Sequence, residues 1–284
     1  MDIKKVAVVG GGTMGNGITH VFALNGFNVS LVEVNQELCK KAIATITKNL
    51  DRQVSKQVIK EEEKLAALKN INEVIGIENV PKDTDLVIEA VYENKEVKLS
   101  IFNKLNNIIK PESIFATNTS SISITELSAS TRPDKFIGMH FMNPVPMMKL
   151  VEIIRGYSTS DETFKTIKAL AEKLGKVPVE VFDYPGFISN RVLLPMINEA
   201  VFALMEGVAS AEDIDTVMKL GMNHPMGPLT LADFIGLDVC LAIMEVLYNG
   251  YNDSKYRPCP LLKKMVAANK LGRKTGEGFF KYEK

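Results

Sequence analysis

The chain has 284 residues, a length sufficient for two domains or one large one. Hydrophobic residues make up 46% of it and charged residues 24%. Lysine plus arginine and aspartate plus glutamate number 34 each, so the net charge is zero and lacks the basic excess that general nucleic-acid binding requires. No run approaches the ~18 apolar residues of a membrane helix, and the segment MDIKKVAVVGGG lacks the apolar core of a secretory signal, so we expect a cytoplasmic protein without a membrane partner. Cys39, Cys240 and Cys259 have neither metal-site nor disulfide spacing, so we expect ordinary thiols and no metal.

Short β-rich runs alternate with helical patterns through the first 185 residues. The predicted strands are Lys5–Val9, Asn28–Val34, Asp85–Ala90, Ile114–Asn118, Phe136–Phe141, Lys149–Ile154 and Val177–Val181. The predicted helices between them include Gln36–Lys69, whole or interrupted, Lys95–Ile109 and Asp161–Leu174. This alternation predicts a parallel sheet with helices on both faces.

Beyond about Pro185 the pattern is helical, with little strand signal. The predicted helices are Phe187–Met205, Ala211–Leu220, Pro228–Leu247 and Leu261–Asn269, separated by glycine and proline. We therefore predict an α/β chain in which a doubly wound domain, residues 1–185, precedes a smaller all-α domain, residues 186–284.

A glycine motif follows the first predicted strand. Val6–Gly15 reads VAVVGGGTMG, which places Gly10, Gly12 and Gly15 in the pattern G-x-G-x-x-G between a strand and a helix. In a Rossmann-type domain the first glycine allows a tight turn, the second lets a pyrophosphate approach the backbone, and the third allows close packing of helix on strand. The pyrophosphate then lies at the positive end of the helix dipole.

Glu33 ends the second predicted strand, where an acidic side chain binds the adenosine ribose. A carboxylate there repels a 2′-phosphate, which favours NAD over NADP. The alternative is a solvated glutamate beside an ordinary glycine turn.

Three further segments carry polar residues: NTSS at Asn118–Ser121, GMHFMNP at Gly138–Pro144 and PGFISNR at Pro185–Arg191. His140 closes one predicted strand, and Glu152 lies among apolar residues in another, where an acid needs a partner. If these strands are neighbours, Glu152 can hold one imidazole nitrogen while the other faces substrate. From these residues alone, a structural histidine is equally plausible.

The chain resembles the short-chain 3-hydroxyacyl-CoA dehydrogenases, particularly the bacterial 3-hydroxybutyryl-CoA dehydrogenases. The resemblance covers essentially the whole chain in one order, through the segments VGGGTMG, IEAVYENKEVK, ATNTSSISI, IGMHFMNPV, KLVEII, YPGFISNR, NHPMGPLTLADFIGLD and GRKTGEGFF. It implies an NAD-dependent enzyme that interconverts a 3-hydroxyacyl-CoA, such as 3-hydroxybutyryl-CoA, and a 3-ketoacyl-CoA, such as acetoacetyl-CoA. It also implies that the helical domain mediates homodimerisation.

The resemblance assigns the catalytic roles residue by residue. His140 is implied to be the general acid/base, Glu152 to orient it, and Ser120 and Asn190 to hold the 3-oxygen of the substrate. In oxidation neutral His140 takes the hydroxyl proton as hydride leaves C3, and in reduction protonated His140 returns it. The alternatives are a hydrogen-bonded turn for Ser120 and a helix N-terminal polar residue for Asn190.

The resemblance also assigns the binding residues. Arg52 and Lys56 correspond to basic residues that bind CoA, although a merely charged helix surface is nearly as plausible. For Glu93, Lys98 and Lys274, the alternative to cofactor binding is a charge on a solvated helix or tail. The residues expected at NAD are Gly10, Gly12, Thr13, Met14, Gly15, Glu33, Ala90, Glu93, Lys98, Asn118, Asn143 and Lys274.

Two rival functions share this fold. One is a non-catalytic NAD-binding protein, which would have lost the histidine, the glutamate or the oxygen-holding residues, whereas all four are present. The other is a different β-hydroxyacid dehydrogenase that relies on a catalytic lysine, and His140 in GMHF disfavours it. The chain departs from the family pattern in having Glu33 where aspartate is more usual and Thr117 where serine is common.

Overall fold

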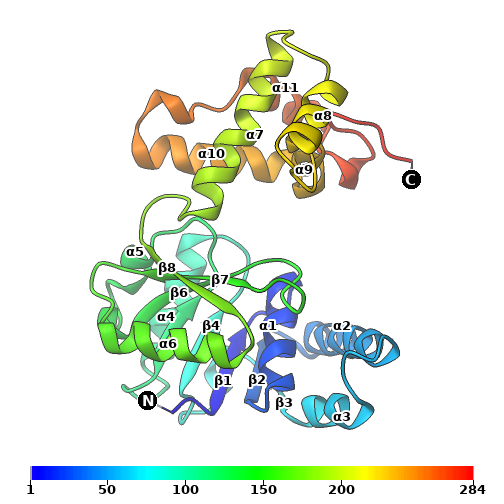
Figure 1. Ribbon diagram of the computed structural model, residues 1–284. Helices are drawn as coiled ribbons and strands as arrows, with labels where there is room; N and C mark the ends of the chain where they lie inside the picture. The colour runs from blue at the N-terminus through cyan, green and yellow to red at the C-terminus, as the bar shows by residue number, and fades with distance from the viewer. Residues whose placement is uncertain (1, 284) are drawn as a thin grey trace. The chain divides into compact units, whose positions relative to one another are not determined.

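The computed structural model describes residues 2–283, which form two compact units (Figure 1). The first unit ends at Asp183 and the second begins at Tyr184. The boundary predicted from composition lies two residues later, between residues 185 and 186.

The first unit is built on an eight-stranded sheet in the order β3-β2-β1-β4-β5-β6-β7-β8. The strands are β1 Lys5–Val9, β2 Asn28–Glu33, β3 Ile71–Ile75, β4 Leu86–Glu89, β5 Ile114–Thr117, β6 Phe136–Phe141, β7 Leu150–Arg155 and β8 Val177–Phe182. The helices are α1 Thr13–Leu24, α2 Gln36–Ser55, α3 Glu61–Lys69, α4 Lys95–Asn106, α5 Ile124–Ser128 and α6 Asp161–Lys173, with 3₁₀ turns at Ile77–Asn79 and Pro133–Lys135. The strand order reverses between β1 and β4, which is the switch point where doubly wound sheets bind ligands.

Two features of the sheet differ from the sequence prediction. The edge strand β3 is absent from the predicted elements, because its INEVI sequence is only partly buried and gives no continuous apolar run. The sheet is also not wholly parallel, since β6 and β7 pair antiparallel. Residues 142–149 are too short a connection for a parallel crossover, which needs about a dozen residues or more.

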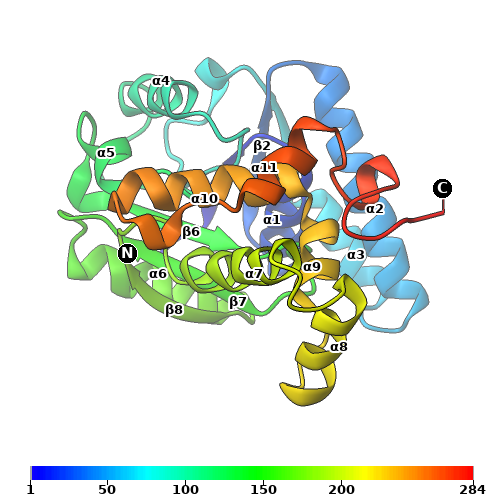
Figure 2. The ribbon, with the colours of Figure 1, turned by 90° about the horizontal axis from the view of Figure 1, so that it is seen from above.

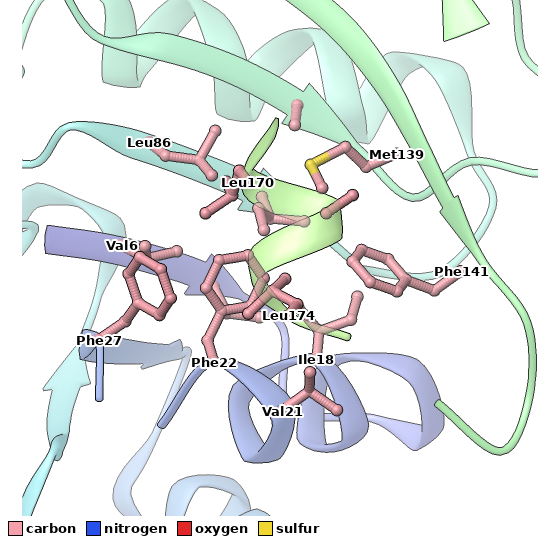
Figure 3. Packing of buried hydrophobic residues seen from close by; sticks show 14 of the residues in the cluster. Val6, Ile18, Val21, Phe22, Phe27, Leu86, Met139, Phe141, Leu170 and Leu174 are labelled. Atoms are coloured by element: carbon pink, nitrogen blue, oxygen red, sulfur yellow. The ribbon is translucent and has the colours of Figure 1, made fainter. Parts of the chain in front are cut away.

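One face of the sheet packs on α1, α2, α3 and α6. Figure 3 shows Phe22 of α1 and Leu170 of α6 among the strand side chains of this cluster, which include Leu86 and Met139. Alternate residues of the central strands take part, namely Val6, Val8, Leu86, Ile88, Ile114, Ala116, Ile137, Met139, Phe141, Val151 and Ile153. Because side chains alternate along a strand, the intervening residues point to the opposite face.

That opposite face carries α4 and its aromatic contacts. Phe102 of α4 lies 4.6 Å from the ring of Phe136 and 5.4 Å from the ring of Phe115, measured between ring centroids. The strand alternation directs four polar residues to the same face: Glu89, Thr117, His140 and Glu152. All four lie at or near the end of the sheet that is formed by the carboxyl ends of β4 and β5.

The second unit is helical, and Figure 2 shows its helices from above. They are α7 Ser189–Met205, α8 Ala211–Gly221, α9 Pro228–Ile235, α10 Leu237–Tyr251 and α11 Pro260–Ala267, with 3₁₀ turns at Ser254–Tyr256 and Arg273–Thr275. Leu194, Val201, Leu229 and Met244 belong to their shared core. The prediction of a single helix over Pro228–Leu247 is wrong. The helix is interrupted at Gly236, because the φ of +104° at this residue is not helical.

The α/β fold class is confirmed, with a doubly wound sheet followed by helices. None of the helices between residues 2 and 283 has the length and apolar character needed to cross a bilayer.

Candidate active site

The glycine turn between β1 and α1 leaves the start of α1 open to an anion. Gly10 adopts a φ of +95°, and its N–H donates to Val32 O at 2.9 Å. A Cβ on Gly15 would lie 1.7 Å from Gly10 O, so only glycine allows this close packing. A Cβ on Gly12 would meet nothing within 4 Å, so the space above the turn is open. Gly12 is the N-cap of α1 and offers no side chain to the first-turn N–H groups, which suits a pyrophosphate.

Glu33 lies beside this turn, at the end of β2. Its Oε1 accepts a hydrogen bond from Gly11 N at 2.6 Å, and its Oε2 accepts one from Val34 N at 3.2 Å. The side chain is therefore held at the carboxyl end of β2, where the acidic residue of a dinucleotide-binding domain binds the ribose.

A cavity of about 910 Å³ lies at the carboxyl ends of β1, β2 and β4. Four residues predicted from the sequence line it: Gly10, Gly12, Glu33 and Ala90. Its apolar walls, which the sequence reasoning missed, include Val34, Leu38, Ile77, Val97 and Ile101. The 3₁₀ turn with Ile77 follows the unpredicted strand β3, so the sequence placed nothing there. An open helix N-terminus, a carboxylate and an apolar cavity together fit a dinucleotide such as NAD.

His140 and Glu152 form a buried pair. They face each other in register on the antiparallel strands β6 and β7, and His140 Nδ1 lies 2.7 Å from Glu152 Oε2. Their exposed fractions are 8% and 2%. A carboxylate oxygen accepts, so Nδ1 is the donor in this contact when Glu152 is ionised, and Nε2 is the second nitrogen of the ring.

The NTSS turn, residues 118–121, follows β5 and is tied to β6. Asn118 Oδ1 accepts a hydrogen bond from Phe141 N at 2.9 Å, next to His140 in the chain. Ser120 N and Ser121 N donate to Glu93 Oε1 at 3.0 and 3.1 Å. The turn is thus held from both sides, and it carries the Ser120 hydroxyl predicted to bind substrate.

Glu93 and Lys98 belong to a network behind this turn. Lys98 is 1% exposed, and its ammonium donates to both oxygens of Glu89 and lies 3.3 Å from Glu93 Oε2. Burial raises the pKa of Glu89, against the opposing effects of Lys98 and Thr117. Burial also opposes ionisation of Glu93, but Lys98 and the hydrogen bonds from the NTSS turn outweigh it, so its pKa lies below the usual value. Lys98 is therefore not a charge on a solvated helix.

The other predicted residues of the first unit lie on α1, on α2 and in the segment after β6. Arg52 and Lys56 are exposed at the carboxyl end of α2, where Lys56 is the cap residue. Asn143 is exposed and precedes Pro144 through a cis peptide bond. Thr13 and Met14 begin α1.

Two predicted residues belong to the second unit. Asn190 lies in the first turn of α7, and Lys274 pairs with Asp238 of α10. No cluster of three or more histidine, cysteine or acidic side chains that could hold a metal occurs within residues 2–283.

Comparisons with known proteins cover both units. Residues 5–184 match the family described as 3-hydroxyacyl-CoA dehydrogenase, NAD binding domain, and residues 186–282 match 3-hydroxyacyl-CoA dehydrogenase, C-terminal domain. A 3-hydroxybutyryl-CoA dehydrogenase of Bradyrhizobium diazoefficiens is 58% identical over 281 residues, covering 99% of this chain and 96% of the relative. The 3-hydroxybutyryl-CoA dehydrogenase of Clostridioides difficile is 53% identical over 281 residues, covering 99% of this chain and 100% of the relative.

A solved structure agrees with these relatives. The crystal structure of (S)-3-hydroxybutyryl-CoA dehydrogenase from Ralstonia eutropha has a TM-score of 0.97 to this chain, with 51% identity and 100% of both chains covered. The chain therefore belongs to the 3-hydroxyacyl-CoA dehydrogenase family and is an NAD-dependent oxidoreductase.

Proposed function

We propose that the protein interconverts 3-hydroxybutyryl-CoA and acetoacetyl-CoA with His140 as the proton-transferring residue. The observation that carries the proposal is the buried pair of His140 Nδ1 and Glu152 Oε2 at 2.7 Å, beside a turn that presents Ser120. The relatives named as 3-hydroxybutyryl-CoA dehydrogenases support this choice of substrate.

The chain's own residues supply the proton chemistry. Neutral His140 accepts the 3-hydroxyl proton at Nε2, while Glu152 holds Nδ1 and stabilises the imidazolium by its charge. Ser120 orients the 3-oxygen by hydrogen bonding, and the family resemblance assigns the same role to Asn190. When bound, NAD⁺ supplies the hydride acceptor, and Gly10, Gly12, Thr13, Met14, Gly15 and Glu33 would hold its pyrophosphate and ribose. In the reverse direction protonated His140 donates to the ketone oxygen.

We propose six further residues at the NAD site, four with support from the structure and two from family resemblance alone. Ala90 lines the cavity, Asn118 and Glu93 fix the turn beside His140, and Lys98 holds Glu93. Asn143 and Lys274 are proposed on family resemblance, and both are exposed.

The test is an NADH absorbance assay with acetoacetyl-CoA, repeated with longer 3-ketoacyl-CoA substrates and with an unrelated 3-keto acid. We expect turnover with the CoA thioesters and a preference for the four-carbon chain. Turnover of the free keto acid alone would contradict the proposal.

Arg52 and Lys56 are proposed to bind the phosphates of CoA, because both are exposed cations at one end of α2. Arg52→Ala and Lys56→Ala should raise KM for acetoacetyl-CoA with little change in kcat, since they act far from the chemistry. Lys40→Ala, an exposed lysine at the start of the same helix, is the control.

We also propose a cytoplasmic homodimer that associates through the second unit. Its support is a set of large apolar side chains that this unit leaves exposed, namely Val217, Leu220, Met222 and Phe234. Sedimentation should give the mass of a dimer for the wild type and a shift toward monomer for Leu220→Glu. A monomeric wild type would contradict the proposal.

A further inference from the structure

We propose that Glu89 is a positioning residue, which acts through Lys98 and Thr117 to fix the NTSS turn and so the Ser120 hydroxyl relative to His140. The inference rests on the proposed function, in which Ser120 holds the substrate oxygen. It adds a residue to that site for which the sequence predicted no role.

Glu89 is placed by the strand register. It is the last residue of β4, and its Cα partner is Thr117, the last residue of β5. Thr117 is in turn the partner of Gly138 in β6, two residues before His140. Because these side chains share one face of the sheet, the carboxylate lies in the same polar row as the histidine.

Every contact of Glu89 in this network is short. Oε1 accepts from Lys98 Nζ and from Val91 N, both at 2.7 Å. Oε2 accepts from Lys98 Nζ at 2.9 Å and from Thr117 Oγ1 at 2.7 Å. The side chain is 0% exposed, and a carboxylate so buried is tolerated only with such partners. Three of these four hydrogen bonds join Glu89 to the side chains of Lys98 and Thr117, and the fourth joins it to the backbone at Val91.

Two routes lead from Glu89 to the turn. The first route passes through Lys98, whose ammonium lies 3.3 Å from Glu93 Oε2. The Glu93 carboxylate in turn accepts hydrogen bonds from Ser120 N, Ser121 N and Thr119 Oγ1. Through Thr117, whose Oγ1 accepts from Thr119 N at 3.2 Å, Glu89 reaches the turn directly. Asn118 then ties the turn to β6 beside His140. If Glu89 loses its charge, Lys98 keeps Glu93 as its remaining anion and should draw it away from the turn.

The first experiment compares Glu89→Gln in two backgrounds by the NADH assay. In the wild-type background we expect kcat to fall roughly 10- to 100-fold, because small misplacements of a substrate-binding group are costly, with a smaller change in KM for acetoacetyl-CoA. In the Ser120→Ala background the same change should lower kcat by less than about 2-fold, since its route of action is already lost. An equal loss in both backgrounds would overturn the proposal.

A matched control separates positioning from stability. Asp85, at the opposite end of β4, is also buried and accepts from Lys110 Nζ at 2.6 Å and from Lys4 N and Lys5 N at 2.9 Å. We expect both Asp85→Asn and Glu89→Gln to lower the melting temperature, but Asp85→Asn should leave kcat within about 2-fold of wild type. A comparable loss of kcat in both variants would show a merely structural role.

Thr117 provides a test that does not depend on removing a buried charge. Thr117→Val keeps the shape but loses the hydroxyl, whereas Thr117→Ser keeps the hydrogen bonds to Glu89 and Thr119. We expect kcat to fall in the first variant and to recover in the second. Wild-type kcat in Thr117→Val would argue against this route.

A crystal structure of Thr117→Val or Glu89→Gln gives a readout that needs no substrate. We expect Ser120 Oγ to move relative to the His140 imidazole; an unmoved turn would overturn the positioning role. This outcome is distinct from failure of the proposed function, which the wild-type assay alone would reveal.

Discussion

Carboxylates recur at the site, and the partner of each decides what it does. Glu152 faces one imidazole nitrogen, Glu33 accepts from backbone N–H groups, and Glu93 gathers the donors of the NTSS turn. Each ionised oxygen accepts and cannot donate, so the donor opposite it is held in one orientation. Neutral substitutions of these carboxylates therefore remove the charge that holds each donor.

His140→Ala should lower kcat by roughly 10²–10⁴-fold, the usual contribution of a positioned proton transfer. Glu152→Gln should also be severe, because an amide cannot stabilise the imidazolium by charge. The double variant should be little worse than His140→Ala alone, since the two act as one unit. The NADH assay measures all three, with circular dichroism as the control for folding. A folded His140→Ala protein with near-wild-type turnover would refute the role of His140.

The second prediction at this scale concerns the choice of cofactor. The wild type should prefer NADH, because Glu33 would oppose the additional phosphate of NADPH. Glu33→Ser should shift the ratio of kcat/KM toward NADPH by roughly 10- to 100-fold, the size expected for one nearby like charge. Glu62→Gln, which removes an exposed carboxylate of α3, should leave the ratio unchanged. A higher kcat/KM for NADPH in the wild type would contradict the placing of Glu33 at the ribose.

Among the elements, the β1–turn–α1 unit shows most directly how local geometry serves binding. The turn brings Gly15 against Gly10 O, while Gly12 faces open space. Within this short motif, Gly15 therefore serves the packing of α1 on the turn, whereas Gly12 leaves space for a ligand.

Gly15→Ala and Gly12→Ala should consequently fail in different ways. The methyl at Gly15 overlaps Gly10 O, so it should lower the melting temperature by several degrees. The methyl at Gly12 has room in the folded chain, so stability should hold while the Kd for NADH rises. Calorimetry and fluorescence titration distinguish the two, with Gly221→Ala, also in open space but in α8, as the control. Unchanged NADH affinity in Gly12→Ala would place the pyrophosphate elsewhere.

For the molecule as a whole, the first unit buries charge and polarity as well as apolar surface. His20 of α1 lies 1% exposed, and its Nε2 is 3.1 Å from Gln53 Oε1. Burial lowers the pKa of His20 below the ordinary 6.5, against the effect of Gln53 and together with that of Lys176. The folded chain thus keeps this ring neutral at a pH where the unfolded chain protonates it.

Stability should therefore fall as the pH drops below 6.5, the ordinary value for this group. Urea unfolding from about pH 7.5 to about pH 5.5 should show a loss of up to about 1.4 kcal/mol per pH unit from this proton, and His20→Gln should remove it. His224→Gln, which changes a histidine of the second unit, should keep the slope. An equally steep slope in His20→Gln would assign the pH dependence to other groups.

Much of this protein follows from local sequence. An α/β unit followed by helices is predicted from the glycine turn, the acid at the end of β2 and the change from alternating strands and helices to helices alone. These signals are local, because periodicity and turn chemistry act over a few residues. Local sequence leaves the pairing of His140 with Glu152 open, and family resemblance rather than spacing favours it.

The tertiary structure decided what depends on distant residues meeting. Strand β3 forms by pairing in parallel with β2, and its own partly exposed sequence has no strong strand pattern. The reversal at β7 brings Glu152 into register with His140, and a one-residue slip would have sent it to the other face. The ion pair of Glu89 and Lys98 likewise depends on burial of both side chains, and no local pattern indicates it. The sequence around Lys98 predicts a polar helix, in which a lysine is expected to be solvated.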